Sequence, residues 1–130
     1  MSAASVLVAD DDEDMRAVLA EELARHGWSV ALARDGDEAE GAMRRAAFTV
    51  AVLDVRMPGP SGVELLVRLR RRGSTMPVVL ITGVTEGLEA LGSEHGAIVL
   101  AKPFSGAALR AALTAAVAGL GAGPGVMTPS

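Results

Sequence analysis

Five short apolar runs recur along the chain, and each is followed by a longer segment whose apolar residues recur at helical spacing. The runs are continuously apolar rather than alternating, which is typical of strands covered on both faces. The expected strands are 5–9, 28–33, 49–53, 77–81 and 97–101. The expected helices are 12–26, 37–47, 61–72, a weak one within 82–96, and 105–120. This alternation predicts an α/β fold in three layers, with helices on both faces of a doubly wound, five-stranded parallel sheet.

Glycine weakens the fourth helical segment. Four glycines lie between residues 82 and 96, and each costs a helix interior about 0.5–1 kcal/mol relative to alanine. The fourth helix is therefore expected to be short or irregular. Residues 121–130 are rich in glycine and proline, so the sequence predicts one domain over 1–120 and a flexible tail or linker over 121–130.

Composition excludes several classes of function. The chain has 130 residues, half of them hydrophobic, and contains neither cysteine nor an apolar run long enough to cross a membrane. Its net charge of −4 and its 2% of aromatic residues argue against nucleic-acid binding. The basic run at 68–72 is interpreted as a solvated helix end. These features indicate a cytoplasmic domain that binds neither nucleic acid nor membrane directly.

Polar side chains stand where the predicted strands end. Asp10 and Asp11 follow the first strand, Asp54 follows the third, Thr82 the fourth and Lys102 the fifth. Ligand sites in open parallel sheets lie beyond the carboxyl ends of the strands. These side chains should therefore meet in one pocket if their strands are near the centre of the sheet.

The chemistry of such a pocket favours phosphoryl transfer. Three crowded carboxylates repel one another and need a cation, and their oxygen atoms suit Mg²⁺. A carboxylate such as Asp54 can act as a nucleophile and form an aspartyl phosphate. Lys102, the sole lysine beside eleven arginines, and the Thr82 hydroxyl would stabilise the phosphoryl oxygens.

Four motifs extend this pattern to most of the chain. They are VLVADDDEDMR at 6–16, LDVRMPGPSG at 53–62, VVLITG at 78–83 and AKPF at 101–104. In this order and spacing, the sequence resembles a bacterial two-component response-regulator receiver domain from residue 5 to about 120. The resemblance implies the flavodoxin-like strand order 2-1-3-4-5.

The resemblance also implies a metal site. Asp11 and the phosphoacceptor Asp54 would bind Mg²⁺, Asp10 would act largely through water, and the backbone carbonyl of Arg56 would be a further ligand. These roles are carried over onto matching positions of the motifs, and they agree with the carboxylate chemistry inferred above.

Further roles are implied around the phosphoryl group. Lys102 would contact it, Thr82 would swing inward to hydrogen-bond it, and the small Gly83 would keep the site open. The Lys102–Pro103 bond would be cis, a geometry that belongs to proline. Val99 departs from the family, which places an aromatic residue there, so the usual coupling through the face of the fourth helix, fifth strand and fifth helix is expected to be altered.

The expected function is therefore that of a phosphoacceptor in a two-component phosphorelay. The domain would catalyse only the acceptance and slow loss of its own phosphoryl group and is not expected to be an enzyme with other turnover. The donor would be a sensor histidine kinase or a histidine phosphotransfer protein that docks on the first helix, including Met15 and Val18, and on the loops around Asp54 and Lys102. The downstream partner is left open.

Two alternative functions are a small aspartate-nucleophile phosphatase and a flavin- or nucleotide-binding module. Arg56 stands where the phosphatase needs an acid, and the Asp10–Asp12 loop would repel an unmetallated phosphate.

Overall fold

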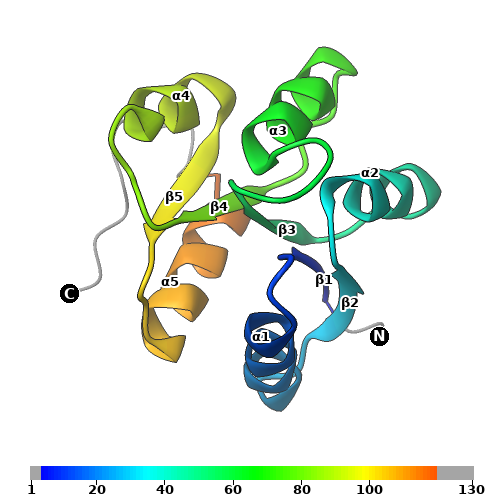
Figure 1. Cartoon of the computed structure of the whole chain (residues 1–130), viewed down its shortest axis with the longest axis vertical. Helices are drawn as coiled ribbons and strands as arrows, with labels where there is room; N and C mark the ends of the chain where they lie inside the picture. Colours follow the sequence, from blue (N-terminus) through cyan, green and yellow to red (C-terminus); the bar gives the residue numbers. More distant parts are fainter. Residues whose placement is uncertain (1–3, 120–130) are drawn as a thin grey trace.

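The computed structural model describes residues 4–119 as one five-stranded parallel sheet with the order β2-β1-β3-β4-β5 (Figure 1). The strands are β1 (Ser5–Ala9), β2 (Ser29–Ala33), β3 (Val50–Asp54), β4 (Val78–Thr82) and β5 (Ala97–Ala101). The strand order is the one that the resemblance implies. It puts β1, β3 and β4 in the interior of the sheet, so the strands that carry the predicted aspartates and threonine are neighbours.

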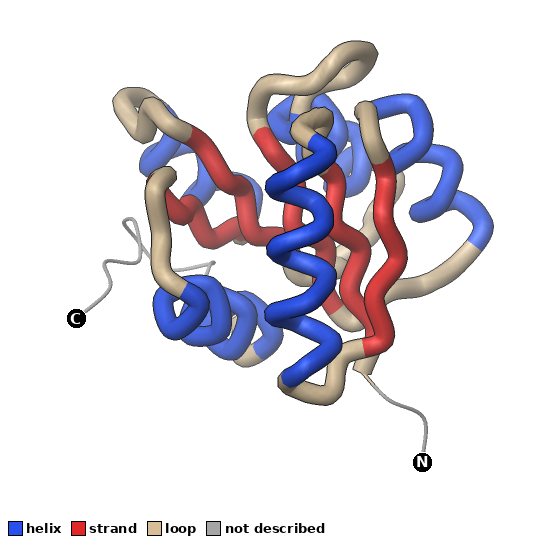
Figure 2. Tube along the Cα trace, turned by 60° about the horizontal axis from the view of Figure 1, so that its bottom comes forward, coloured by secondary structure: helices blue, strands red, loops and turns tan. Residues whose placement is uncertain are grey.

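Helices cover both faces of the sheet, as the apolar strands predict. They are α1 (Glu13–Arg25), α2 (Gly36–Arg45), α3 (Gly62–Arg71), α4 (Leu88–His95) and α5 (Gly106–Val117). Helices α1 and α5 pack on one face, and α2, α3 and α4 pack on the other (Figures 1 and 2). Alternate residues of each central strand enter the two apolar cores, which is why these strands are apolar throughout. Within residues 4–119, no helix has the length and apolarity needed to cross a bilayer.

Strand β2 departs from the prediction that every strand is covered on both faces. It is an edge strand that pairs only with β1, and Ser29 and Leu32 on it are exposed. An edge strand has one neighbouring strand, and β2, unlike β5 at the other edge, also has little helical cover, which a short apolar run in a sequence does not reveal. Trp28 lies just before the strand and packs, half-buried, against the core under α1 and α5.

Side-chain caps fix where most of the helices begin. Asp12 accepts hydrogen bonds from the Asp14 and Met15 amides, and Ser61 forms a capping box with Glu64 at the start of α3. Ser105 caps α5 through the Ala108 amide. These caps agree with the predicted starts of α1, α3 and α5. They also direct the chain from a strand end into a helix within a few residues.

The other helix ends show where local patterns mislead. Helix α2 begins at Gly36, one residue before its predicted start, because Asp35 provides the cap. Ala46 is exposed after the helix ends, although it was expected to face inward. Helix α5 ends at Val117, and the predicted tail at 121–130 lies outside the described residues.

Helix α4 is short, as its glycines predict. It has eight residues and lies between Gly87 and Gly96, whose φ angles of 81° and 69° are in the left-handed region that glycine adopts without strain. Gly92 is buried against β5, where a Cβ atom would lie 2.9 Å from the Cγ2 atom of Val99. The same residue type that shortens the helix thus lets α4 approach the sheet closely.

Arg70 is not part of a solvated basic face, contrary to the prediction for the run at 68–72. Its guanidinium group donates to the carbonyls of His95 at 2.6 Å, Ser74 at 3.1 Å, Met76 at 2.9 Å and Gly96 at 3.4 Å. Burial lowers the pKa of Arg70 from its usual value, and the five donors of an arginine keep the charge satisfied. One side chain therefore joins the end of α3 to the segments that lead into β4 and β5.

This linkage predicts a large effect of Arg70→Ala on stability. We expect the free energy of unfolding to fall by about 2–4 kcal/mol, because charge-assisted hydrogen bonds are lost and several carbonyls are left unpaired. Arg71→Ala, at an exposed neighbour, should change it by less than about 0.5 kcal/mol. Urea denaturation followed by circular dichroism measures both. Equal effects of the two substitutions would contradict the structural role of Arg70.

Candidate functional site

The polar residues predicted to converge do so at the carboxyl edge of the sheet. Asp10 directly follows β1, Asp54 and Thr82 are the last residues of β3 and β4, and Lys102 directly follows β5. The parallel register aligns these ends, because β3, β4 and β5 stop within a residue of one another along the ladder. Side chains separated by up to 92 positions in the sequence are thereby neighbours in space.

Lys102 connects two carboxylates across this edge. Its Nζ atom lies 2.9 Å from Asp54 Oδ2 and 3.4 Å from Asp10 Oδ2. The backbone amide of Lys102 donates to the Thr82 carbonyl at 2.7 Å, which continues the β4–β5 pairing to the site. The Lys102–Pro103 peptide bond is cis, as the resemblance implies.

Backbone amides hold the remaining carboxylate oxygens. The buried Asp10 accepts the Asp12 amide through Oδ1 at 2.9 Å, and Asp54 accepts the Arg56 amide through Oδ1 at 3.1 Å. Each carboxylate thus accepts a hydrogen bond from a backbone amide through one oxygen and from the ammonium group of Lys102 through the other. Arg16 donates to the carbonyl of Asp10 at 2.8 Å, a contact that no pattern in the sequence predicts.

Three carboxylates are placed to receive a cation. One oxygen each from Asp10, Asp11 and Asp54 lies within 4.8 Å of the others, and Asp11 is the exposed member of the three. Three negative charges against the single positive charge of Lys102 leave an excess of two. All-oxygen donors and this excess charge fit a hard divalent ion such as Mg²⁺.

Burial and charge shift the pKa values of two groups in the site. Burial raises the pKa of Asp10, and the charge of Asp54 adds to this, while the Asp12 amide and Lys102 oppose it. Burial lowers the pKa of Lys102, but the hydrogen bond and charge of Asp54, together with the charge of Asp10, outweigh it and leave that pKa raised. The ammonium form of Lys102 is therefore favoured while Asp10 carries an unfavourable charge.

Thr82 ends β4 at the edge of the sheet that holds the site, but its hydroxyl is bonded elsewhere. Its hydroxyl donates to the Val84 carbonyl at 3.0 Å and accepts the Val84 amide at 3.1 Å. An inward swing of the side chain, as the resemblance implies, would have to break both bonds. A Cβ atom at the exposed Gly83 would meet nothing within 4 Å, so packing does not require glycine there. Val99 is buried on β5, packed against α4.

Comparison with known proteins identifies the family. The family model of the response regulator receiver domain matches residues 6–114. The chain therefore belongs to the response regulator receiver domain family. Its strand order, its five helices and its cluster of aspartates are consistent with that membership.

Individual relatives agree with the family match. The chain is 36% identical over 107 residues to the probable transcriptional regulatory protein TcrX of Mycobacterium tuberculosis, covering 78% of this chain and 44% of that protein. The Francisella response regulator 1452 receiver domain superposes with a TM-score of 0.81 at 30% identity, covering 88% and 97% of the two chains. The response regulator TrrA of Thermotoga maritima, solved with Mg²⁺ and BeF, gives 0.77 at 25% identity, covering 85% and 96%. The chain spans less than half the length of the curated relatives it matches.

The raised pKa of Asp10 predicts a stabilising substitution. In metal-free buffer at pH 7, Asp10→Asn should raise the free energy of unfolding by about 1 kcal/mol, because a buried charge beside Asp54 is removed. The folded state binds the Asp10 proton more tightly than the unfolded state, so this charge reduces stability as pH rises above 3.8, the usual pKa of an aspartate.

The advantage of Asp10→Asn should therefore shrink as pH falls toward 3.8. Chemical denaturation with EDTA at a series of pH values measures it. Asp14→Asn, at an exposed position on α1, is the matched control. A variant that is less stable than the parent protein at pH 7 would show that Lys102 and the Asp12 amide fully compensate the buried charge.

Proposed function

We propose that this receiver domain accepts a phosphoryl group on Asp54 from a phosphohistidine of a sensor kinase or phosphotransfer protein. The observation that carries the proposal is the environment of Asp54: an almost buried carboxylate at a strand end, 2.9 Å from the only lysine of the chain. A carboxylate held this way is a preorganised nucleophile beside a fixed positive charge.

In the proposed step, a carboxylate oxygen of Asp54 attacks phosphorus while the phosphorus–nitrogen bond of the donor breaks. The electrons of the broken phosphorus–nitrogen bond stay with the imidazole nitrogen. The new phosphorus–oxygen bond converts the Asp54 carboxylate into an acyl phosphate. Lys102 faces the carboxylate and neutralises charge on the phosphoryl oxygens, and the Arg56 amide holds the second carboxylate oxygen. The chain's own groups thus orient the nucleophile and stabilise the transferred charge.

A divalent cation completes the charge balance of this proposal. Asp10, Asp11 and Asp54, with the backbone carbonyl of Arg56, are the groups that would hold Mg²⁺. When bound, the ion supplies positive charge that stabilises the oxygens of the phosphoryl group. Asp10 is buried and fixed by the Asp12 amide, whereas Asp11 is exposed and free to adjust to the ion.

Thr82 is proposed to respond to the phosphoryl group. A new acceptor beside the end of β4 would compete with the Val84 carbonyl for the Thr82 hydroxyl. Release of Val84 would alter the loop that leads into the short helix α4. The proposed output is a changed surface around this loop, which a downstream partner would read.

A groove between α1 and α5 supports docking of the phosphoryl donor. The groove has a volume of about 290 Å³ and is lined by Met15, Leu19, Phe104 and Leu109, with Val18 exposed at 63%. It also includes Pro103, the residue after Lys102. A helix of the donor seated here would bring its phosphohistidine to Asp54.

Nothing in the site favours the phosphatase or flavin-binding alternatives, because Arg56 and the acidic β1–α1 loop oppose them.

Phosphorylation of the intact protein tests the proposal. With Mg²⁺ and phosphoramidate, whose phosphorus–nitrogen bond resembles that of phosphohistidine, the mass should rise by one phosphoryl group. Asp54→Asn should abolish the increment, and Asp14→Asn, on the exposed side of α1, should retain it. Phosphorylation of Asp54→Asn to the parent level would exclude Asp54 as the acceptor.

Metal binding is tested separately through stability. Adding MgCl₂ should raise the thermal unfolding midpoint, because a ligand that binds only the folded state stabilises it. Asp11→Asn should require about tenfold more Mg²⁺ for the same shift, which corresponds to about 1.4 kcal/mol of lost binding. Glu13→Gln removes an exposed acid nearby and is the control. An identical Mg²⁺ response of Asp11→Asn and the parent protein would remove Asp11 from the ligand set.

A further inference from the structure

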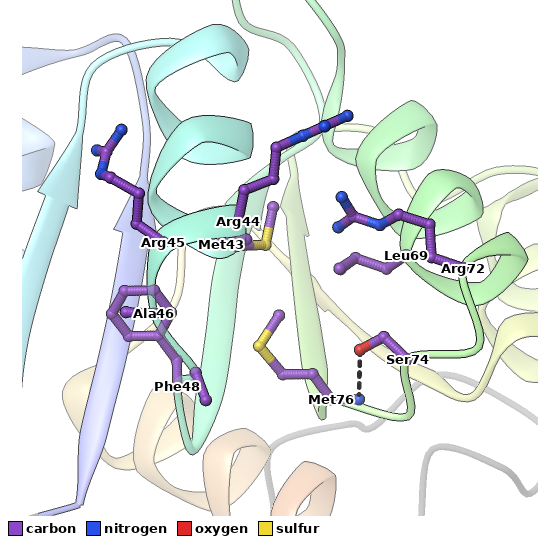
Figure 3. Close-up of a pocket in the computed structure, with 10 residues that line it drawn as sticks. Met43, Arg44, Arg45, Ala46, Phe48, Leu69, Arg72, Ser74 and Met76 are labelled. Carbon is purple, nitrogen blue, oxygen red and sulfur yellow. Dashed lines mark hydrogen bonds between the residues drawn. The ribbon is translucent and has the colours of Figure 1, made fainter.

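A pocket at the opposite edge of the sheet lies between the ends of α2 and α3 (Figure 3). It has a volume of about 380 Å³ and is formed by the last residues of these helices and the segments that lead into β3 and β4. The five-residue strands separate this edge from the carboxyl edge by roughly 16 Å. The pocket is therefore remote from Asp54 and plays no part in the chemistry proposed above.

The floor of the pocket is apolar and adaptable. Met43, Phe48, Leu69 and Met76 contribute to its lining, and Leu69 is almost fully buried. Ser74 contributes a hydroxyl that already accepts the Met76 amide at 3.2 Å. Methionine side chains adjust their shape to a partner more readily than branched residues do, so they are common at surfaces that bind protein segments.

Arginines surround this floor. Arg44 near the end of α2 and Arg72 just after α3 both line the pocket between the two helices, while Arg45 lies on the other side of α2 (Figure 3). Arg44 has one distant ion pair, at 3.8 Å from Glu40. Among residues 4–119, no carboxylate lies within ion-pair distance of Arg45 or Arg72. No acidic residue lines the pocket.

Helix ends explain part of this arrangement but not all of it. Basic residues are favourable in the last turn of a helix, so α2 and α3 would each carry arginine there without a ligand. Helix ends do not require Arg44 and Arg72 to line the same pocket as Met43, Leu69 and Met76. Arg44 and Arg72 both line the pocket, and Glu40, 3.8 Å from Arg44, is the one carboxylate among residues 4–119 paired with either of them, so the pocket is electropositive and an acidic partner would complement its charge.

We propose that this pocket is a second docking surface, for a protein segment that carries an apolar side chain flanked by carboxylates. The apolar side chain would insert between Met43, Leu69 and Met76, and the carboxylates would pair with Arg44 and Arg72. Arginine and methionine are enriched at protein interfaces, which favours a protein segment over a small anion. Since the pocket is remote from Asp54, the domain would bind such a partner whether or not it is phosphorylated.

The test uses the full chain labelled with ¹⁵N and a capped hexapeptide, Glu-Glu-Leu-Phe-Glu-Glu. Titration should give saturable shifts in amides of residues 43–48 and 69–76. The double variant Arg44→Gln/Arg72→Gln should weaken binding by about tenfold, because two exposed charge pairs are lost. Arg71→Gln removes the same charge from an exposed position on α3 that does not line the pocket, and should change the affinity less than twofold.

Three further arms make the outcome decisive. The Lys-Lys-Leu-Phe-Lys-Lys peptide should not bind, and octanoate should bind far more weakly than the acidic peptide. Phosphorylation of the double variant by phosphoramidate should equal that of the parent protein, so failure of this proposal is distinct from failure of the proposed function. Absence of saturable shifts, shifts that map to the α1–α5 groove, or equal binding of both peptides would overturn the proposal. Tight binding of octanoate would assign the pocket to a small amphiphile instead.

Discussion

The contact of one ammonium group with two buried carboxylates is the interaction on which the site depends. Lys102 lies 2.9 Å from Asp54 and 3.4 Å from Asp10, and neither carboxylate has much access to water. Removal of these charges from water is costly unless each is paired and hydrogen-bonded. The Asp12 and Arg56 amides offset part of that cost because the chain turns sharply after β1 and β3, although burial still leaves the pKa of Asp10 raised. The sheet topology makes the triple contact possible because β1 and β3 are neighbours, and Lys102 reaches their carboxylates from the end of β5, across β4.

The alternation of apolar runs and helical segments was sufficient to predict the layers, the parallel sheet and the edge at which the site lies. These features follow from periodicity and from the rule that sites lie beyond the carboxyl ends of parallel strands. The strand order came from the resemblance, since periodicity does not say which strands are neighbours. The convergence of Asp10, Asp54 and Lys102 then required only that these strands be close together.

Other features were beyond the sequence for physical reasons. The Arg70 side chain was expected to be solvent-exposed because it lies in a run of arginines. It bonds instead to carbonyls up to 26 residues away, which come within reach only in the folded chain. Arg16 bonds the carbonyl of Asp10, and main-chain acceptors leave no trace in a sequence. The exposure of Leu32 reflects the edge position of β2, which apolarity alone does not encode. In each case the missing information is tertiary.

The region between Thr82 and Lys102 is built differently from the rest of the fold. Helix α4 has eight residues, begins without a side-chain cap and lies between two left-handed glycines, whereas α3 has a full capping box. Its approach to β5 through Gly92 and Val99 leaves little space between them. A change at Thr82 would therefore act on the weakly stabilised helix α4. It would not act through an aromatic side chain that changes rotamer, because the corresponding residue here is Val99.

The two edges of the sheet carry opposite charge for a common reason. Each strand leads into a helix at the carboxyl edge and each helix returns to the amino edge, so helix starts gather at one edge and helix ends at the other. Acidic residues are favourable at helix starts and basic residues at helix ends, and the first turns of α1, α2 and α3 are acidic while their last turns are basic. The net charge of −4 does not show this separation of acidic and basic residues between the two edges. The topology that gathers carboxylates for a cation at one edge therefore also gathers arginines at the other, where an anionic partner is the complementary ligand.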